Sequence, residues 1–212
     1  MATFYIIMHI FCFQGVFDLN KPVSLQKMTM AAMLIAVGIA IPIFSPAKVI
    51  LEPASFTLAS HVPVFLSMFI SPAVAIVVAL GTTLGFFLGG FPIVVVLRAA
   101  THIIFAVIGS IILQKHPKLL LSTTKTQIFS FFIAIVHALG ELCVVSIFYF
   151  GGDVGASYYN QGFVTSVLLL VGLGSVVHSM IDFTLSLGLL KVLNTQKSFS
   201  ELFSKQEKEF PR

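Results

Sequence analysis

Charged residues are scarce in this 212-residue sequence, and their scarcity excludes a soluble globular domain. Only 9% of the residues are charged and 58% are hydrophobic, whereas about a quarter of the residues in a typical soluble domain are charged. The mean hydropathy is +1.05. The apolar residues lie in long runs rather than in alternating ten-residue segments, which indicates membrane-spanning helices and not a β-barrel.

Several catalytic and cofactor-binding patterns are also absent. The sequence has no Walker A lysine motif, no HExxH, no GxSxG and no paired-glutamate motif of the intramembrane protease kind, so we expect neither ATP nor peptide hydrolysis by this chain. Cys12 and Cys143 are far apart in apolar surroundings and indicate neither a disulfide framework nor a zinc site. Basic and aromatic residues are not interleaved, which argues against nucleic-acid binding. We therefore expect a protein that is not an enzyme and holds no cofactor or metal of its own.

Six apolar segments predict an all-α integral membrane protein, a compact bundle of six transmembrane helices. Their approximate ranges are 28–44, 57–70, 73–90, 92–113, 128–150 and 163–190. The bundle domain is expected over 24–192, between an apolar N-terminal segment at 1–23 and a charged cytoplasmic tail at 193–212. Nearly all lysines lie in the N-terminal flank, in the connector before the fifth helix and in the tail, so the positive-inside rule places both termini in the cytoplasm.

Two stripes of small residues recur at four-residue spacing within the predicted helices. The first helix carries Ala32, Ala36 and Ala40, and the third carries Gly81, Gly85 and Gly89. Residues four apart share one helix face, and small side chains there let another helix approach closely. Both stripes therefore predict helix-packing surfaces. A phosphate-binding interpretation of the glycines fails because they lie inside a helix and not between a strand and a helix.

Ionisable residues inside three apolar segments form pairs at four-residue spacing. The pairs are Arg98 with His102, His137 with Glu141, and His178 with Asp182, and His61 lies in the second segment. A guanidinium keeps its proton, and burying it in hydrocarbon costs at least about 2.5 kcal/mol, so Arg98 requires an anion, water or a ligand. Counted from the segment ends, Glu141 reaches the same depth and is the predicted counter-ion. Asp182 is expected nearer the cytoplasm, where a structural role is as plausible as a ligand contact.

Together these features resemble a known family of membrane proteins. Six compact helices, the stripe of Ala32, Ala36 and Ala40, cytoplasmic termini and polar outer halves of the later helices resemble the substrate-binding S component of an energy-coupling-factor (ECF) vitamin transporter over about residues 24–192. The stretch 43–98, with SPAKVILEPASFTLASHVP and GTTLGFFLGGFPIVVVLR, is similar to the niacin branch. The resemblance implies that the alanine stripe docks on a membrane coupling (T) subunit and that two cytoplasmic ABC ATPases bind ATP. This chain would then capture the vitamin in a bacterial plasma membrane.

The polar residues give the resemblance a chemical basis. An arginine recognises a planar carboxylate through two parallel hydrogen bonds, so niacin would bind Arg98 while its ring nitrogen meets His102 or His61. The predicted substrate-binding residues are Arg98, His102, Glu141, His61, His137, Asn160 and Tyr158, of which the last two lie in the outer connector before the sixth helix.

Other interpretations of these residues stay open. Arg98 and Glu141 also suit a purely structural ion pair, buried histidines commonly just hydrogen-bond a neighbouring helix, and tyrosines are expected at a membrane surface anyway. A second function class is a stand-alone permease or channel for a divalent metal or other small solute. The histidines and carboxylates could ligate a metal ion, although the fixed charge of Arg98 would repel it. A structural membrane scaffold is the third class.

Overall fold

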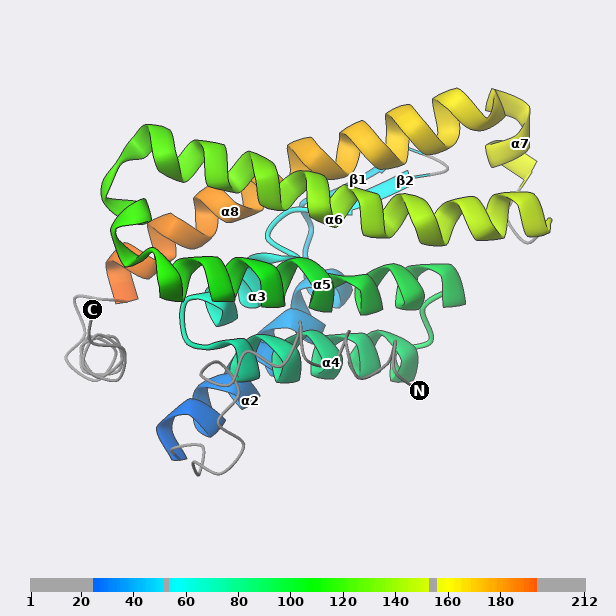
Figure 1. The fold of residues 1–212 in the computed structure, drawn as a ribbon. Helices are drawn as coiled ribbons and strands as arrows, with labels where there is room; N and C mark the ends of the chain where they lie inside the picture. The colour runs from blue at the N-terminus through cyan, green and yellow to red at the C-terminus, as the bar shows by residue number, and fades with distance from the viewer. Residues whose placement is uncertain (1–24, 52–53, 153–155, 194–212) are drawn as a thin grey trace, which may run out of the picture.

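Helices form most of the structure, a computed structural model that describes residues 25–51, 54–152 and 156–193 (Figure 1). Its elements are α2 (Leu25–Phe44), β1 (Lys48–Leu51), β2 (Ala54–Thr57), α3 (Val62–Met68), α4 (Pro72–Leu88), α5 (Ile93–Lys115), the 3₁₀ helix η1 (Pro117–Leu121), α6 (Thr123–Gly151), α7 (Ala156–Phe163), the π-helix η2 (Val164–Leu173) and α8 (Gly174–Leu193). The N-terminal segment expected at 1–23 and the tail from residue 194 onward lie outside the described residues.

Four helices are long and apolar enough to cross a membrane. They are α2, α5, α6 and the continuous helix Tyr159–Leu193, which contains η2 and α8. The apolar helix α4 is shorter, with 17 residues. Large apolar side chains such as Leu84, Phe131 and Leu168 are exposed on the outside of the bundle, as expected for a surface covered by lipid. The chain is therefore a multi-pass membrane protein.

The second predicted transmembrane helix is wrong in length. In place of a span over 57–70 the structure has α3, whose 7 residues give a helix about 10 Å long, far too short to cross a bilayer. The preceding residues instead form an antiparallel hairpin of β1 and β2. Ala59 then adopts a left-handed backbone conformation with φ of 67°, which turns the chain into the bundle before α3 begins.

The short helix α3 lies at the centre of the bundle, where it contacts α2, α4, α5 and α8. All its residues are buried. The ring of Phe65 lies 5.2 Å from that of Phe105 on α5 and 5.3 Å from that of Phe183 on α8. Because aromatic rings bury large areas and pack in specific geometries, these contacts fix α3 and hence the position of His61, which directly precedes it.

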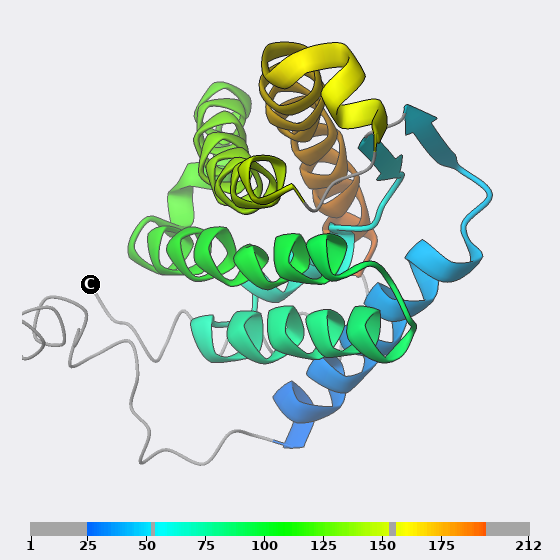
Figure 2. The same ribbon diagram turned by 90° about the vertical axis from the view of Figure 1, so that its right-hand side faces the viewer.

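Two glycines of α4 pack against isoleucine side chains of α2, which runs obliquely beside α4 (Figure 2). A Cβ atom added to Gly81 would lie 2.6 Å from the side chain of Ile35, and one added to Gly85 would overlap the side chain of Ile39. The close-packing role predicted for these two glycines is therefore confirmed. It follows from the missing Cβ atoms, which let the two helices approach.

The alanine stripe of α2 points away from this contact. Ala32 and Ala36 are exposed and Ala40 is half-buried, and the neighbouring Met33 and Val37 are exposed as well. A continuous face of small and apolar side chains is thus left without a partner among the described residues.

The contact between α2 and α4 can be tested with a single methyl group. We expect Gly85→Ala to destabilise the protein by about 1 to 3 kcal/mol, because the added Cβ overpacks the site of Ile39, and to lower the thermal unfolding temperature in detergent. Gly188→Ala is the matched control, since a Cβ atom there meets nothing within 4 Å. Equal unfolding temperatures for the two variants would contradict the packing described here.

Candidate functional site

Four histidine rings and two carboxylates converge at the N-terminal end of α3. The ring centroid of His61 lies 4.7 Å from that of His102 on α5, 4.6 Å from that of His137 on α6 and 4.9 Å from that of His178 on α8. All four histidines are buried. The three i,i+4 pairs predicted from the sequence therefore face the same interior region, and His61 lies at its centre.

Arg98 and Glu141 form the predicted ion pair. Arg98 Nε donates to Glu141 Oε1 at 3.2 Å and Arg98 Nη2 donates to Glu141 Oε2 at 3.0 Å. The hydroxyl of Ser175 on α8 also donates to Glu141 Oε2. This bidentate arrangement is the strongest common form of arginine–carboxylate contact, and removing one partner of such a buried pair typically costs about 3 to 5 kcal/mol.

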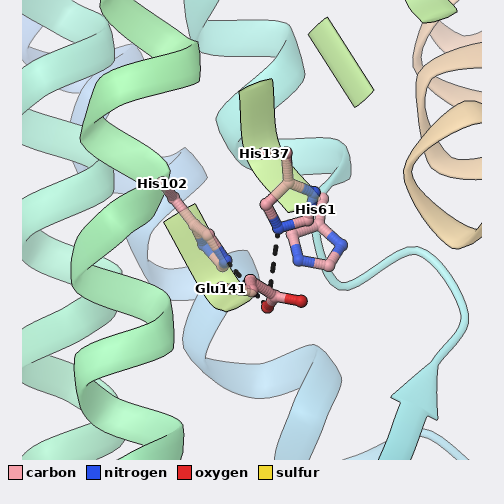
Figure 3. Close-up of side chains that lie close together, drawn as sticks. All are labelled: His61, His102, His137 and Glu141. Atoms are coloured by element: carbon pink, nitrogen blue, oxygen red, sulfur yellow. Dashed lines mark ion pairs between the residues drawn. The ribbon is translucent and has the colours of Figure 1, made fainter. Parts of the chain in front are cut away.

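The imidazoles of His102 and His137 point toward Glu141 without reaching hydrogen-bond distance (Figure 3). His102 Nε2 lies 3.8 Å and His137 Nε2 lies 3.5 Å from Glu141 Oε1. Neither atom has a hydrogen-bond partner among the described residues, and the same holds for His137 Nδ1. A buried polar atom without a partner costs about 1 to 3 kcal/mol, so these nitrogens are available to a further hydrogen-bonding or ligating group.

Asp182 holds the turn that leads into α3. Its carboxylate accepts the backbone N–H groups of Ala59 at 2.8 Å and of His61 at 2.9 Å, and His61 Nδ1 lies 3.1 Å from Asp182 Oδ2. His178 Nε2 lies 3.4 Å from the same oxygen. The fully buried Asp182 thus stabilises the left-handed Ala59 and orients the His61 ring, which is a structural role.

A cavity of about 240 Å³ borders these polar groups. One part of its wall is apolar and aromatic, and the other is polar. The lining residues are Pro42, Phe56, Thr57, Ser60, His61, Phe86, Phe91, Pro92, Val95, Arg98, Ala99, His102, Glu141, Ser175 and His178. Pockets for drug-sized ligands have about 300 to 1,000 Å³, so this cavity suits a molecule of one ring.

The structure brings most of the predicted binding residues together. Arg98, His102, Glu141 and His61 line the cavity, and His137 lies behind them against the ring of His61. The two residues predicted from the outer connector are not among the described residues that line the cavity. Asn160 is exposed on α7 and does not line this cavity, and the side chain of Tyr158 lies outside the described ones.

Sequence reasoning missed several residues of the site. Ser175 precedes His178 by three residues and Asp182 by seven, a spacing that puts all three on one helix face and could have identified it. The aromatic wall had no comparable signal. Phe56 comes from the hairpin and packs against Gly174, where an added Cβ atom would lie 2.6 Å from the Phe56 ring.

Comparison with known proteins gives one curated relative. The sequence is 46% identical over 176 residues to the niacin transporter NiaX of Lactococcus lactis subsp. cremoris, and the aligned region covers 82% of this chain and 78% of the relative. No family model matches the sequence. No solved structure matches it either.

The anchoring role of Asp182 predicts a specific loss of stability. Asp182→Asn keeps the side-chain size but removes the charge that the N–H groups of Ala59 and His61 contact, and hydrogen bonds to charged groups contribute about 1.5 to 3 kcal/mol each. We expect a clearly lower thermal unfolding temperature in detergent. Ser179→Ala, one helical turn away, removes a buried hydroxyl without a partner among the described residues and should not lower it. If Asp182→Asn and Ser179→Ala both unfold at the temperature of the wild type, Asp182 does not anchor the turn before α3.

Proposed function

We propose that this chain, which belongs to the family of the niacin transporter NiaX, captures niacin as the substrate-binding S component of an ECF transporter. The substrate assignment rests on one observation: the guanidinium of Arg98 lies on the wall of a cavity that is large enough for a molecule of one ring. Niacin is a flat pyridine ring with one carboxylate. Its two chemical features match the two kinds of wall that this cavity offers.

The carboxylate of niacin would take the place of Glu141 on Arg98. A guanidinium binds any carboxylate in the same bidentate geometry, so the exchange replaces like with like. Glu141 would keep the hydroxyl of Ser175 and would approach His102 and His137, whose Nε2 atoms already lie within 3.8 Å of its Oε1 atom. The alternative of a purely structural pair predicts no such movement.

The aromatic wall suits the ring of niacin. Phe86 and Phe91 lie with ring centroids 4.8 Å apart, and both line the cavity together with Phe56. Aromatic rings pack against one another in edge-to-face or offset geometry. The ring nitrogen of niacin, an acceptor, would then receive a hydrogen bond from His102 or His61, which lie on the polar side.

The exposed alanine face of α2 is the proposed docking surface for the coupling subunit. Ala32, Ala36 and the half-buried Ala40 would pack against a T subunit helix, because small residues let two helices approach closely. In this proposal two ABC ATPases bind ATP on the cytoplasmic side and this chain is neither an enzyme nor an ATP-binding subunit. Both termini lie in the cytoplasm, in keeping with the distribution of lysines, and the cavity accepts niacin from outside.

Substrate recognition by Arg98 can be tested with matched ligands. We expect the purified wild type to bind niacin at least tenfold more tightly than nicotinamide, because one charge-assisted hydrogen bond contributes about 1.5 to 3 kcal/mol and 1.4 kcal/mol is tenfold. Arg98→Lys keeps the positive charge that balances Glu141 but loses the planar guanidinium that binds a carboxylate through two hydrogen bonds. It should weaken niacin binding about 10- to 100-fold and change nicotinamide binding little.

The control for this titration is Lys125→Ala, which removes a positive charge outside the cavity and should bind niacin like the wild type. Unchanged niacin affinity in Arg98→Lys would mean that the substrate carboxylate binds elsewhere.

Docking through α2 can be tested separately from substrate binding. We expect Ala36→Trp to abolish co-purification with the T subunit and the ATPases and to leave niacin binding intact, because the indole fills the close contact. Leu84→Trp is the control, since Leu84 is an exposed apolar residue on α4. An Ala36→Trp protein that assembles normally would contradict this docking surface.

A further inference from the structure

Three imidazoles and one carboxylate meet beside the cavity, and we propose that they bind a divalent transition-metal ion. His61, His102, His137 and Glu141 each offer one ligand atom, and these four atoms all lie within 4.8 Å of one another. All four residues are buried. Imidazole nitrogens with one carboxylate oxygen are the donor set that zinc and similar metals prefer in proteins.

The distances are close to those of a metal centre. Ligand atoms about 2.0 to 2.1 Å from a tetrahedral metal lie about 3.4 Å from one another. Glu141 Oε1 lies 3.5 Å from His137 Nε2 and 3.8 Å from His102 Nε2. These two separations are longer than ordinary hydrogen bonds, and with all four ligand atoms within 4.8 Å of one another the side chains would have to move closer together to hold a metal ion.

Two ligand atoms of the cluster have unsatisfied lone pairs or N–H groups. His102 and His137 are 7% and 1% exposed, and the Nε2 atom of each has no hydrogen-bond partner among the described residues. Figure 3 shows both rings directed at Glu141 from different helices. A metal ion between these groups would satisfy both nitrogens at once, whereas the cavity ligand of the proposed function would reach His102 but not His137, which does not line the cavity.

Asp182 supplies the outer support that metal-binding histidines usually have. A ligating histidine commonly donates its second ring N–H to a carboxylate, which fixes the tautomer and the ring orientation. Asp182 Oδ2 lies 3.1 Å from His61 Nδ1, and an ionised carboxylate can only accept. With the hydrogen on Nδ1, the Nε2 atom of His61 carries the lone pair that a metal requires.

The charge of Arg98 is not an obstacle in this arrangement. Both oxygens of Glu141 accept hydrogen bonds from the guanidinium, so the two residues together are close to neutral. Asp182 contributes a further negative charge next to the cluster. The proposed metal site does not depend on niacin being the occupant of the cavity.

The test is a titration of the purified full chain in detergent with Co²⁺, after treatment with EDTA and without niacin. We expect one equivalent to bind, with the visible absorption of four-coordinate cobalt, and Zn²⁺ to displace it. His137→Gln and His102→Gln should each weaken binding by more than about tenfold. His116→Gln is the control, because His116 lies between α5 and η1 and belongs to neither the cavity nor the cluster, and it should bind like the wild type.

Absence of stoichiometric cobalt binding in the wild type would overturn the proposal, and so would equal affinities in the wild type and both ligand variants. Thermal unfolding without metal checks that each variant is folded. If His137→Gln does not fold, the test rests on His102→Gln, whose side chain lies at the cavity wall. Niacin is titrated separately in EDTA. Binding of niacin without any cobalt site refutes the metal proposal alone, and binding of cobalt without niacin affinity refutes the proposed function alone.

Discussion

A permanent positive charge inside a membrane protein must be compensated, and Arg98 is the residue to which this constraint applies. At 3.0 Å its attraction to Glu141 is on the order of 5 kcal/mol for an effective dielectric constant of about 20. The desolvation of two buried ions costs several kcal/mol each, so the pair contributes little net stability. A carboxylate from outside would meet Arg98 in the same bidentate geometry, and Glu141 would then need hydrogen bonds from Ser175, His102 and His137 in place of the guanidinium.

The fold serves this site by placing a short helix where a full span was expected. Because α3 begins within the bundle, the preceding His61 lines the same cavity as Arg98. Asp182 accepts two backbone N–H groups of the turn before α3. The rings of Phe105 and Phe183 pack against Phe65 and fix the position of α3. The same carboxylate that anchors the fold also orients His61, so stability and site geometry depend on one buried residue.

The helices and the ion pair could be predicted because both follow from simple periodicities. Apolar runs of membrane length locate the long helices, and the depth of residues along them brings Arg98 level with Glu141. The four-residue spacing of Gly81 and Gly85 predicted close packing correctly, whereas Gly89, the third glycine of that stripe, is exposed at the C-cap of α4. The length of α3 could not be predicted in this way, since His61 and Pro63 stand in a continuous apolar run that hides the hairpin and the left-handed Ala59. Which aromatic residues form the cavity wall depends on tertiary packing, and Phe56 therefore had no signal in the sequence.

The claim that the pair of Arg98 and Glu141 opens for the substrate is tested most directly by an experimental structure of the niacin complex. We expect both carboxylate oxygens of niacin to lie within hydrogen-bond distance of the Arg98 guanidinium and Glu141 to have moved toward His102 and His137. A complex in which Glu141 still accepts both hydrogen bonds of Arg98, with niacin bound away from the guanidinium, would contradict it.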